Sequence, residues 1–301
     1  MRIFCLVIML VGMTLMAVTA YRYYSLIKYN NQETYAVKQE RRITQKVSLV
    51  LMFVFIGGFC VGIFDILTRQ VEPIYFFVVI IFFLGASFIF SAVSAQGEMA
   101  VALRGKTMET MKTFVNAIDL KDAYTKGHSA HVYQIVRLFY EYFDEKRKDR
   151  INEPKLLDAA LLHDIGKISI KDETLNKPGR LSEEDWANIR QHPLNGKKML
   201  DDTTFAEISD WVLYHHERID GQGYYGMRAE EIPEESRIIT IADTYSALCT
   251  DRVYRKKQTH RQAVEIMKEA MGTQLDTELM QIFLRIPEQE LETLAAGSLP
   301  Q

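Results

Sequence analysis

The residues best suited to chemistry in this sequence are His163 and Asp164, which follow the apolar run 159–162. A histidine and a carboxylate at the end of an apolar helix are costly to bury unless a partner compensates for their lost hydration. Imidazole and carboxylate groups together suit first-row divalent cations. Neighbouring helical residues point about 100° apart, so one of the two can hold one ion while the other reaches a second. The pair therefore predicts a metal centre.

The other polar residues of this kind fall in similar contexts. The chain has seven histidines, and the first of them is His128. Asp243 follows the apolar run 238–242, and a carboxylate within an apolar helix requires a counter-charge. The full set of candidate ligands is His128, His163, Asp164, His192, His215, His216 and Asp243.

Short motifs around these residues resemble those of the HD-GYP family, a branch of the HD superfamily of metal-dependent phosphohydrolases. Residues 163–167 match its HDIGK, and residues 175–179 match its LNKPG. Residues 215–225 resemble HHERxDGxGYP, and residues 252–255 resemble RPYR. The resemblance covers roughly residues 114–285, and it is specific because several spaced motifs agree in order.

The resemblance implies a helical fold and a two-metal centre that hydrolyses phosphodiesters, usually converting cyclic di-GMP to linear pGpG, GMP or both. Carried over to this sequence, the ligands of one metal are His128, His163, Asp164 and Asp243. Asp164 would bridge to the second metal, whose other ligands are His192, His215 and His216. Mixed histidine and carboxylate ligation favours iron or manganese, with zinc, nickel or cobalt as alternatives.

The resemblance also implies roles for residues near the metals. Two ions ~3.5–4 Å apart can activate a water and clamp the phosphoryl oxygens, so we expect the bridging Asp164 to be catalytic. Lys167 follows it closely in sequence and is expected to contact a phosphate oxygen as a point charge. Tyr224, Arg252 and Arg255 are expected to contact the substrate.

Several positions depart from the family's pattern. Tyr225 replaces the proline of GYP, so the loop lacks a fixed backbone angle and is expected to be less rigid. Ser246 replaces an aspartate, which removes one acceptor behind the ligands. Tyr124 stands where members thought to hold a third metal have an acidic residue, so we expect two ions. His131, where the family usually has arginine, is interpreted as an exposed neighbour of His128.

Apolar residues are concentrated before residue 98, in the uncharged stretches Ile3–Tyr21, Val47–Phe64 and Pro73–Gly97. Each stretch approaches or exceeds the ~18–20 residues that cross a bilayer as a helix. The remainder shows apolar runs of helical period and no alternating strand pattern. We therefore expect an all-α protein, with three transmembrane helices at 1–97, a linker or signalling helix at 98–119 and a helical-bundle HD-GYP domain at 120–301.

Basic residues in the short loops predict the orientation in the membrane. The loop between the second and third stretches has a single basic residue, Arg69. The loop between the first two holds Arg22, Lys28, Lys38, Arg41, Arg42 and Lys46. The first loop should therefore be cytoplasmic, which anchors the protein in a bacterial inner membrane with its catalytic domain in the cytoplasm. A rival interpretation makes residues 18–20 the cleavage site of a signal peptide, but the basic loop would then lie outside.

Residues 98–119 leave two interpretations open. Val101, Met108, Met111, Val115 and Ile118 recur at spacings of seven, three and four, as in a coiled-coil seam of a homodimer or in a helix that packs on its own domain. The formal net charge of the chain is −3, and no basic field that would attract DNA is present. The three cysteines offer no disulfide framework, which fits a reducing compartment.

Three functions compete at this point. The complete ligand set favours a membrane-anchored phosphodiesterase of cyclic di-GMP. Tyr225 and Ser246 are the support for a catalytically quiet signalling module that binds a nucleotide. A hydrolase of a different cyclic dinucleotide is the third, because the ligands determine the type of reaction and not the base. The expected partners are a cyclic dinucleotide and the lipid bilayer.

Overall fold

The computed structural model describes residues 2–29, 35–69, 72–122, 127–250 and 257–294. Within these ranges the secondary structure is helical, apart from an isolated bridge between Met271 and Leu275. The expectation of an all-α protein is confirmed. The chain divides into two compact units, Met1–Thr107 and Met108–Gln301, and each is described separately below.

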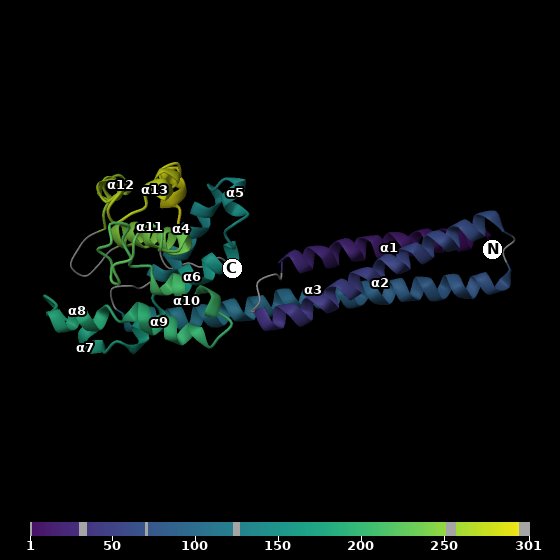
Figure 1. The fold of residues 1–301 in the computed structure, drawn as a ribbon, viewed down its shortest axis with the longest axis horizontal. Helices are drawn as coiled ribbons and strands as arrows, with labels where there is room; N and C mark the ends of the chain where they lie inside the picture. Colours follow the sequence, from purple (N-terminus) through teal and green to yellow (C-terminus); the bar gives the residue numbers. More distant parts are fainter. Residues whose placement is uncertain (1, 30–34, 70–71, 123–126, 251–256, 295–301) are drawn as a thin grey trace. The chain divides into compact units, whose positions relative to one another are not determined.

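Three long helices build the N-terminal unit (Figure 1). They are α1 (Arg2–Tyr29), α2 (Tyr35–Thr68) and the first part of α3 (Pro73–Lys121). By length and composition, the segments Arg2–Ser25, Lys46–Thr68 and Pro73–Lys121 could each cross a membrane. They correspond to the three apolar stretches of the sequence.

The three helices pack closely and present apolar side chains outward. The rings of Phe55 on α2 and Phe82 on α3 lie 5.7 Å apart. Gly58 permits this approach, because a Cβ atom there would lie 2.6 Å from a ring carbon of Phe82. Phe53 and Phe88 are 65% and 73% exposed, which suits helices surrounded by hydrocarbon rather than by water.

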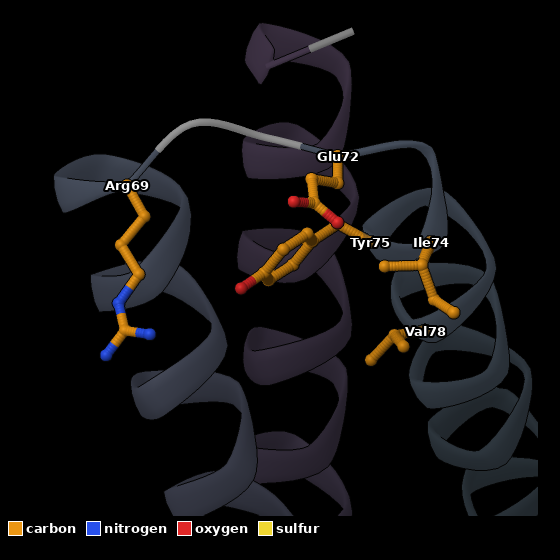
Figure 2. A pocket seen from close by; sticks show the side chains of 5 residues that line it. All are labelled: Arg69, Glu72, Ile74, Tyr75 and Val78. Carbon is orange, nitrogen blue, oxygen red and sulfur yellow. The ribbon is translucent and has the colours of Figure 1, made fainter.

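A shallow hollow of about 470 Å³ lies beside the connection between α2 and α3. Figure 2 shows the side chains that line it, which are Arg69, Glu72, Ile74, Tyr75 and Val78. One cation, one anion and several apolar groups share this small, open surface. Their mixed chemistry selects no particular class of ligand.

The C-terminal unit is an assembly of shorter helices that begins with the end of α3. Met111 and Val115 on α3 are 5% and 2% exposed and belong to the apolar core of this unit. Of the two interpretations of the linker pattern, the structure therefore shows a helix that packs on its own domain. Met108, Met111, Val115 and Ile118 pack within the chain, whereas Val101 is 68% exposed.

Eleven further α-helices and two short 3₁₀ helices follow in the described part of this unit. They are α4 (His128–Glu141), α5 (Glu145–Lys148), α6 (Glu153–Leu162), η1 (Ile165–Ser169), α7 (Asp172–Leu175), α8 (Glu183–Ile189), α9 (His192–Asp201), η2 (Ala206–Ile208), α10 (Ser209–Leu213), α11 (Glu234–Cys249), α12 (His260–Glu269), α13 (Thr277–Phe283) and α14 (Glu288–Glu292).

The apolar core of this unit holds together the helices that carry the candidate ligands. Phe139 on α4, Leu156 on α6 and Ile238 on α11 are fully buried in it. The start of α6 is set by Asn152, whose side chain accepts a hydrogen bond from the Lys155 backbone N–H. The cap at Asn152 and the core packing of Leu156 hold α6 in place. His163 follows directly after the last residue of this helix.

Candidate metal centre

The candidate ligands lie at or near helix ends, except for Asp243 in the middle of α11. His128 begins α4, and the preceding Gly127 has a positive φ of 76° that favours glycine. The Gly127 backbone N–H donates to the carboxylate of Asp119 over 2.7 Å, which ties the start of α4 to α3. His163 and Asp164 follow the end of α6. His192 begins α9, and His215 and His216 follow the end of α10.

The carboxylate of Asp164 faces two groups of histidines with its two oxygens. Its Oδ1 lies 3.2 Å from Nε2 of His192 and 4.0 Å from Nε2 of His215. Its Oδ2 lies 3.3 Å from Nε2 of His163. Two clusters able to hold a metal ion therefore share this residue, namely Asp164 with His192, His215 and His216, and Asp164 with His128 and His163.

Asp243 joins the second of these clusters through His128. Oδ1 of Asp243 lies 2.9 Å from Nε2 of His128. The rings of His128 and His163 are 5.6 Å apart, centroid to centroid. All seven predicted ligands are therefore brought together, while their assignment to two separate ions stays a prediction of the family resemblance.

Three of the histidines are oriented by backbone carbonyls of the turn that precedes them. Nδ1 of His163 lies 2.8 Å from the Ala160 oxygen, and Nδ1 of His192 lies 2.8 Å from the Ile189 oxygen. Nδ1 of His215 lies 2.6 Å from the Val212 oxygen. A carbonyl can only accept, so each Nδ1 carries the hydrogen and each Nε2 is left with a free lone pair. This is the tautomer that a metal ligand of this kind needs.

Burial and neighbouring charges set the protonation of the cluster. Burial, together with the neighbouring His192, lowers the pKa of His216 to about 3, and burial likewise holds the pKa of His215 well below its usual value. Although burial opposes it, Lys167 and His163 hold the pKa of the Asp164 carboxyl well below its usual range. His215 and His216 are thus neutral and Asp164 is ionised, which are the forms that bind metals.

The donor set fits a divalent cation in a further respect. Nε2 of His163 is buried and has no hydrogen-bond partner among the described residues. An unpartnered buried nitrogen costs free energy unless another species binds it. The negative charges of Asp164 and Asp243 raise the pKa of His163 to about 9 against the effect of burial, so this nitrogen lies where a positive charge is stabilised.

Comparison with known families decides the classification. The family model described as an HD domain matches residues 112–279, which is more than half of the chain. The chain belongs to the HD-GYP branch of the HD-domain family. HD domains are metal-dependent, in agreement with the cluster of histidine and aspartate side chains.

Curated relatives of this HD-GYP chain are phosphodiesterases of cyclic dinucleotides. A cyclic di-GMP phosphodiesterase of Pseudomonas aeruginosa is 40% identical over 130 residues, which cover 42% of this chain and 31% of the relative. A 3'3'-cGAMP-specific phosphodiesterase of Vibrio cholerae is 36% identical over 167 residues, covering 55% of this chain and 36% of the relative. A cyclic di-GMP phosphodiesterase response regulator of Xanthomonas campestris is 33% identical over 182 residues, covering 59% and 47%. The matched regions thus span less than half the length of each relative.

The predicted substrate contacts of the HD-GYP domain are partly described. Nζ of Lys167 lies 2.8 Å from Oδ2 of Asp164 and 3.1 Å from Oδ2 of Asp122, so a buried carboxylate holds this lysine beside the cluster. The ring of Tyr224 lies 4.9 Å from that of His216 and is partly exposed. The two predicted arginines, Arg252 and Arg255, lie outside the described residues, as does Tyr124.

A cation that the sequence did not single out lies next to this tyrosine. The guanidinium carbon of Arg190 is 5.8 Å from the centroid of the Tyr224 ring. Arg190 caps the C-terminus of α8 and belongs to none of the recognised motifs. Arg190 lies two positions before the candidate ligand His192, but only the tertiary structure shows its contact with Tyr224.

The loop that contains Tyr225 is held more firmly than its departure from GYP suggested. The Tyr225 backbone N–H donates to Glu217 over 2.7 Å, and the Met227 N–H donates to the same carboxylate over 2.8 Å. A proline at position 225 would lack the first of these donors. Glu217 is 2% exposed, so the expected loss of rigidity is compensated by a buried carboxylate that binds the loop.

The expectation that His131 is exposed is wrong. His131 is 4% exposed rather than a surface residue, and Ser246 is fully buried. Oγ of Ser246 lies 2.8 Å from Nδ1 of His128 and 2.9 Å from Nδ1 of His131. The serine therefore still offers a hydrogen-bonding oxygen to Nδ1 of the candidate ligand His128. The same oxygen is a polar partner for the buried ring of His131.

Proposed function

We propose that this protein is a membrane-anchored, two-metal phosphodiesterase that hydrolyses cyclic di-GMP to linear pGpG, GMP or both. The observation that carries the proposal is the carboxylate of Asp164, whose two oxygens face two separate histidine groups. A carboxylate in this position suits two adjacent ions better than one. The names of the relatives support a cyclic dinucleotide as the substrate.

The proposed ligands are those that the sequence predicted. One ion would be held by His128, His163, Asp164 and Asp243, and the other by Asp164, His192, His215 and His216. Iron or manganese fits this mixture of imidazole and carboxylate best, and zinc, nickel or cobalt are alternatives. When bound, the pair of ions supplies Lewis acidity to the phosphodiester and lowers the pKa of an attacking water.

The chain's own residues would orient the substrate around the ions. Lys167 is held at the cluster by Asp122 and can donate to a non-bridging phosphate oxygen. Tyr224 presents a partly exposed ring beside His216, on which a guanine base can stack. Arg252 and Arg255 would contact the second phosphate or the guanine edges, by the family resemblance alone.

A decisive experiment compares the full chain, purified in detergent and loaded with manganese or iron, with its Asp164→Asn variant. We expect the wild type to release pGpG or GMP from cyclic di-GMP and to hold two ions, and the variant to lose both properties. Asp201→Asn is a matched control, because Asp201 pairs with Lys197 outside the cluster. A wild type that holds two ions and leaves every cyclic dinucleotide intact would contradict the proposal and favour the quiet signalling module.

A second candidate substrate is 3'3'-cGAMP. It is favoured by the relative from Vibrio cholerae, which is specific for this dinucleotide and 36% identical over 167 residues. The ligand set is the same for both substrates, so it does not distinguish them. Initial rates on cyclic di-GMP and 3'3'-cGAMP at equal manganese loading would decide, and a tenfold or greater preference for 3'3'-cGAMP would replace the first substrate by the second.

The proposed location is the bacterial inner membrane, with the catalytic domain in the cytoplasm. Three helices long and apolar enough to span a bilayer support the anchor, and the basic loop between the first two supports the orientation. Alkaline phosphatase fused after residue 301 should be inactive, and the same fusion within 69–72 should be active. The reverse pattern would contradict the orientation. Crosslinking of the full chain in membranes would test for a homodimer.

A further inference from the structure

The hydroxyl group of Ser246 lies between two imidazole rings that come from α4. Its Oγ is 2.8 Å from Nδ1 of His128 and 2.9 Å from Nδ1 of His131. None of the three residues is more than 4% exposed. Each of these hydrogen bonds is therefore sheltered from water, and their directions must be mutually consistent.

His128 differs in this respect from three other candidate ligands. At His163, His192 and His215, Nδ1 faces a backbone carbonyl, which can only accept a hydrogen bond. At His128, Nδ1 faces a hydroxyl, which can either donate or accept. The serine alone therefore does not determine which nitrogen of His128 carries the hydrogen.

The second imidazole can set this direction, provided that its own hydrogen is on Nε2. A neutral imidazole has one nitrogen without a hydrogen, and if that nitrogen is Nδ1 of His131, it accepts the single hydrogen of the Ser246 hydroxyl. The serine oxygen can then only accept from Nδ1–H of His128, and Nε2 of His128 keeps its lone pair. Burial lowers the pKa of His131 to about 4, so its ring is neutral at physiological pH, as this arrangement requires.

We propose that His131 is a positioning residue which, through the Ser246 hydroxyl, holds His128 in the tautomer that directs the lone pair of Nε2 to the metal shared with Asp243. The inference rests on the metal centre proposed above. It also accounts for two departures of the sequence from the HD-GYP pattern at once, because positions 131 and 246 are in contact. Neither residue touches a metal ion or the substrate in this role.

The test is a Mn²⁺ titration of the metal-free full chain in detergent, in which the electron paramagnetic resonance signal reports free Mn²⁺. Loss of a group that orients a ligand typically lowers metal affinity by about 10–100-fold. We expect His131→Leu and Ser246→Ala to weaken one of the two Mn²⁺ sites by about tenfold or more. His131→Gln should bind nearly as the wild type does, because its amide oxygen can accept from the serine hydroxyl.

Two further variants separate positioning from packing. His260→Leu is the matched control, since Nδ1 of His260 also bonds a hydroxyl, that of Tyr245, but no candidate ligand lies behind it. Its Mn²⁺ affinity should equal that of the wild type. In a Ser246→Asp background the carboxylate can only accept, so there His131→Leu should change the affinity by less than about threefold.

Wild-type affinity in His131→Leu would overturn the proposal, as would an equal loss with and without Ser246→Asp. Circular dichroism of each variant checks folding, and His131→Gln gives a result even where His131→Leu does not fold. The titration contains no nucleotide. A protein that fails to hydrolyse cyclic dinucleotides would therefore refute the proposed function without affecting this inference. A wild-type protein that binds no Mn²⁺ would refute both.

Discussion

The two units of the molecule bury polar groups in different ways. Among the described residues of the N-terminal unit, the buried hydroxyl of Thr19 donates to the Leu15 carbonyl of its own helix over 2.7 Å, and the buried Oγ of Ser94 has no hydrogen-bond partner. In the C-terminal unit, buried histidines and carboxylates contact one another across α4, α6, α9 and α11, and Nε2 of His163 remains without a hydrogen-bond partner. Single hydroxyl groups on a helix are compatible with a structural role, whereas a cluster of titratable side chains with an unpartnered nitrogen points to a ligand.

The units also differ in how closely their backbones approach. In the N-terminal unit, Gly58 makes room for the side chain of Phe82. In the C-terminal unit, a Cβ atom on Gly166 would lie 1.9 Å from the backbone oxygen of His192. The first contact can relax by a small movement of a ring, but the second cannot relax without separating two elements of the metal centre. The predictions below use this contrast, from the largest expected effect to the smallest.

Gly166→Ala should have the largest effect. The new methyl group would overlap the His192 carbonyl and also lie 2.5 Å from the backbone nitrogen of Gly196, so η1 must move away from α9. We expect a loss of about 4 kcal/mol of unfolding free energy, or a folded protein that no longer holds two metals. Thermal unfolding and metal content of the purified full chain measure both. Wild-type stability together with full metal content would show that this contact is not rigid.

Glu217→Gln should have an intermediate effect that is confined to the loop of Tyr224. The carboxylate accepts two backbone N–H groups, whereas the amide nitrogen of glutamine cannot accept, so one buried donor loses its partner. The expected cost is about 1–3 kcal/mol. Because Glu217 is not a candidate ligand, KM for the dinucleotide should rise while metal content stays constant. A loss of metal with unchanged KM would contradict the assignment of this residue to the loop.

Acidification should destabilise the metal-free protein through His131. The unfolded chain takes up a proton on this residue near its ordinary pKa of 6.5, but the folded protein does so only near 4, because burial disfavours the charged ring. The folded state binds fewer protons between these values, so its stability falls as the pH is lowered from 6.5 to 4, by about 1.4 kcal/mol per pH unit. Chemical unfolding at pH 6.5 and 5 should show a larger loss for the wild type than for His131→Gln. Equal losses would contradict the assigned shift.

Gly58→Ala should have the smallest effect. Its Cβ would lie 2.6 Å from the outer edge of the Phe82 ring, which can shift slightly, so we expect a cost of about 1 kcal/mol and unchanged metal content. Gly57→Ala is the matched control, because no atom lies within 4 Å of a Cβ at that position. A loss of metal in Gly58→Ala would show that the N-terminal unit influences the centre more directly than the comparison of the two units suggests.

The sequence predicted those features that depend on residue type and order. Three uncharged stretches indicated the long helices, and the order of the histidines and aspartates indicated the clusters that meet at Asp164. Both signals are strong because charge is excluded from apolar helices and because metal ligands come from a small set of residue types. The assignment of each ligand to a particular ion stays a prediction.

Features that depend on contacts between distant residues could not be predicted. His131 is interpreted as exposed because the family usually has an arginine at that position, and its partner Ser246 lies 115 positions further along the chain. The proline replacement at Tyr225 indicated a looser loop, but Glu217 compensates from eight positions away. The helical spacing of Met111 and Val115 was compatible with two kinds of packing, and only the tertiary structure distinguished them.

The carbonyl contacts of His163, His192 and His215 have a consequence for the free energy of metal binding. Each carbonyl belongs to the residue three positions before its histidine, so local chain conformation orients the ring. The rotational freedom of these three imidazoles is therefore lost when the helices form, before any cation arrives. An incoming ion then meets rigid donors, and little of its binding free energy is diverted into ordering them.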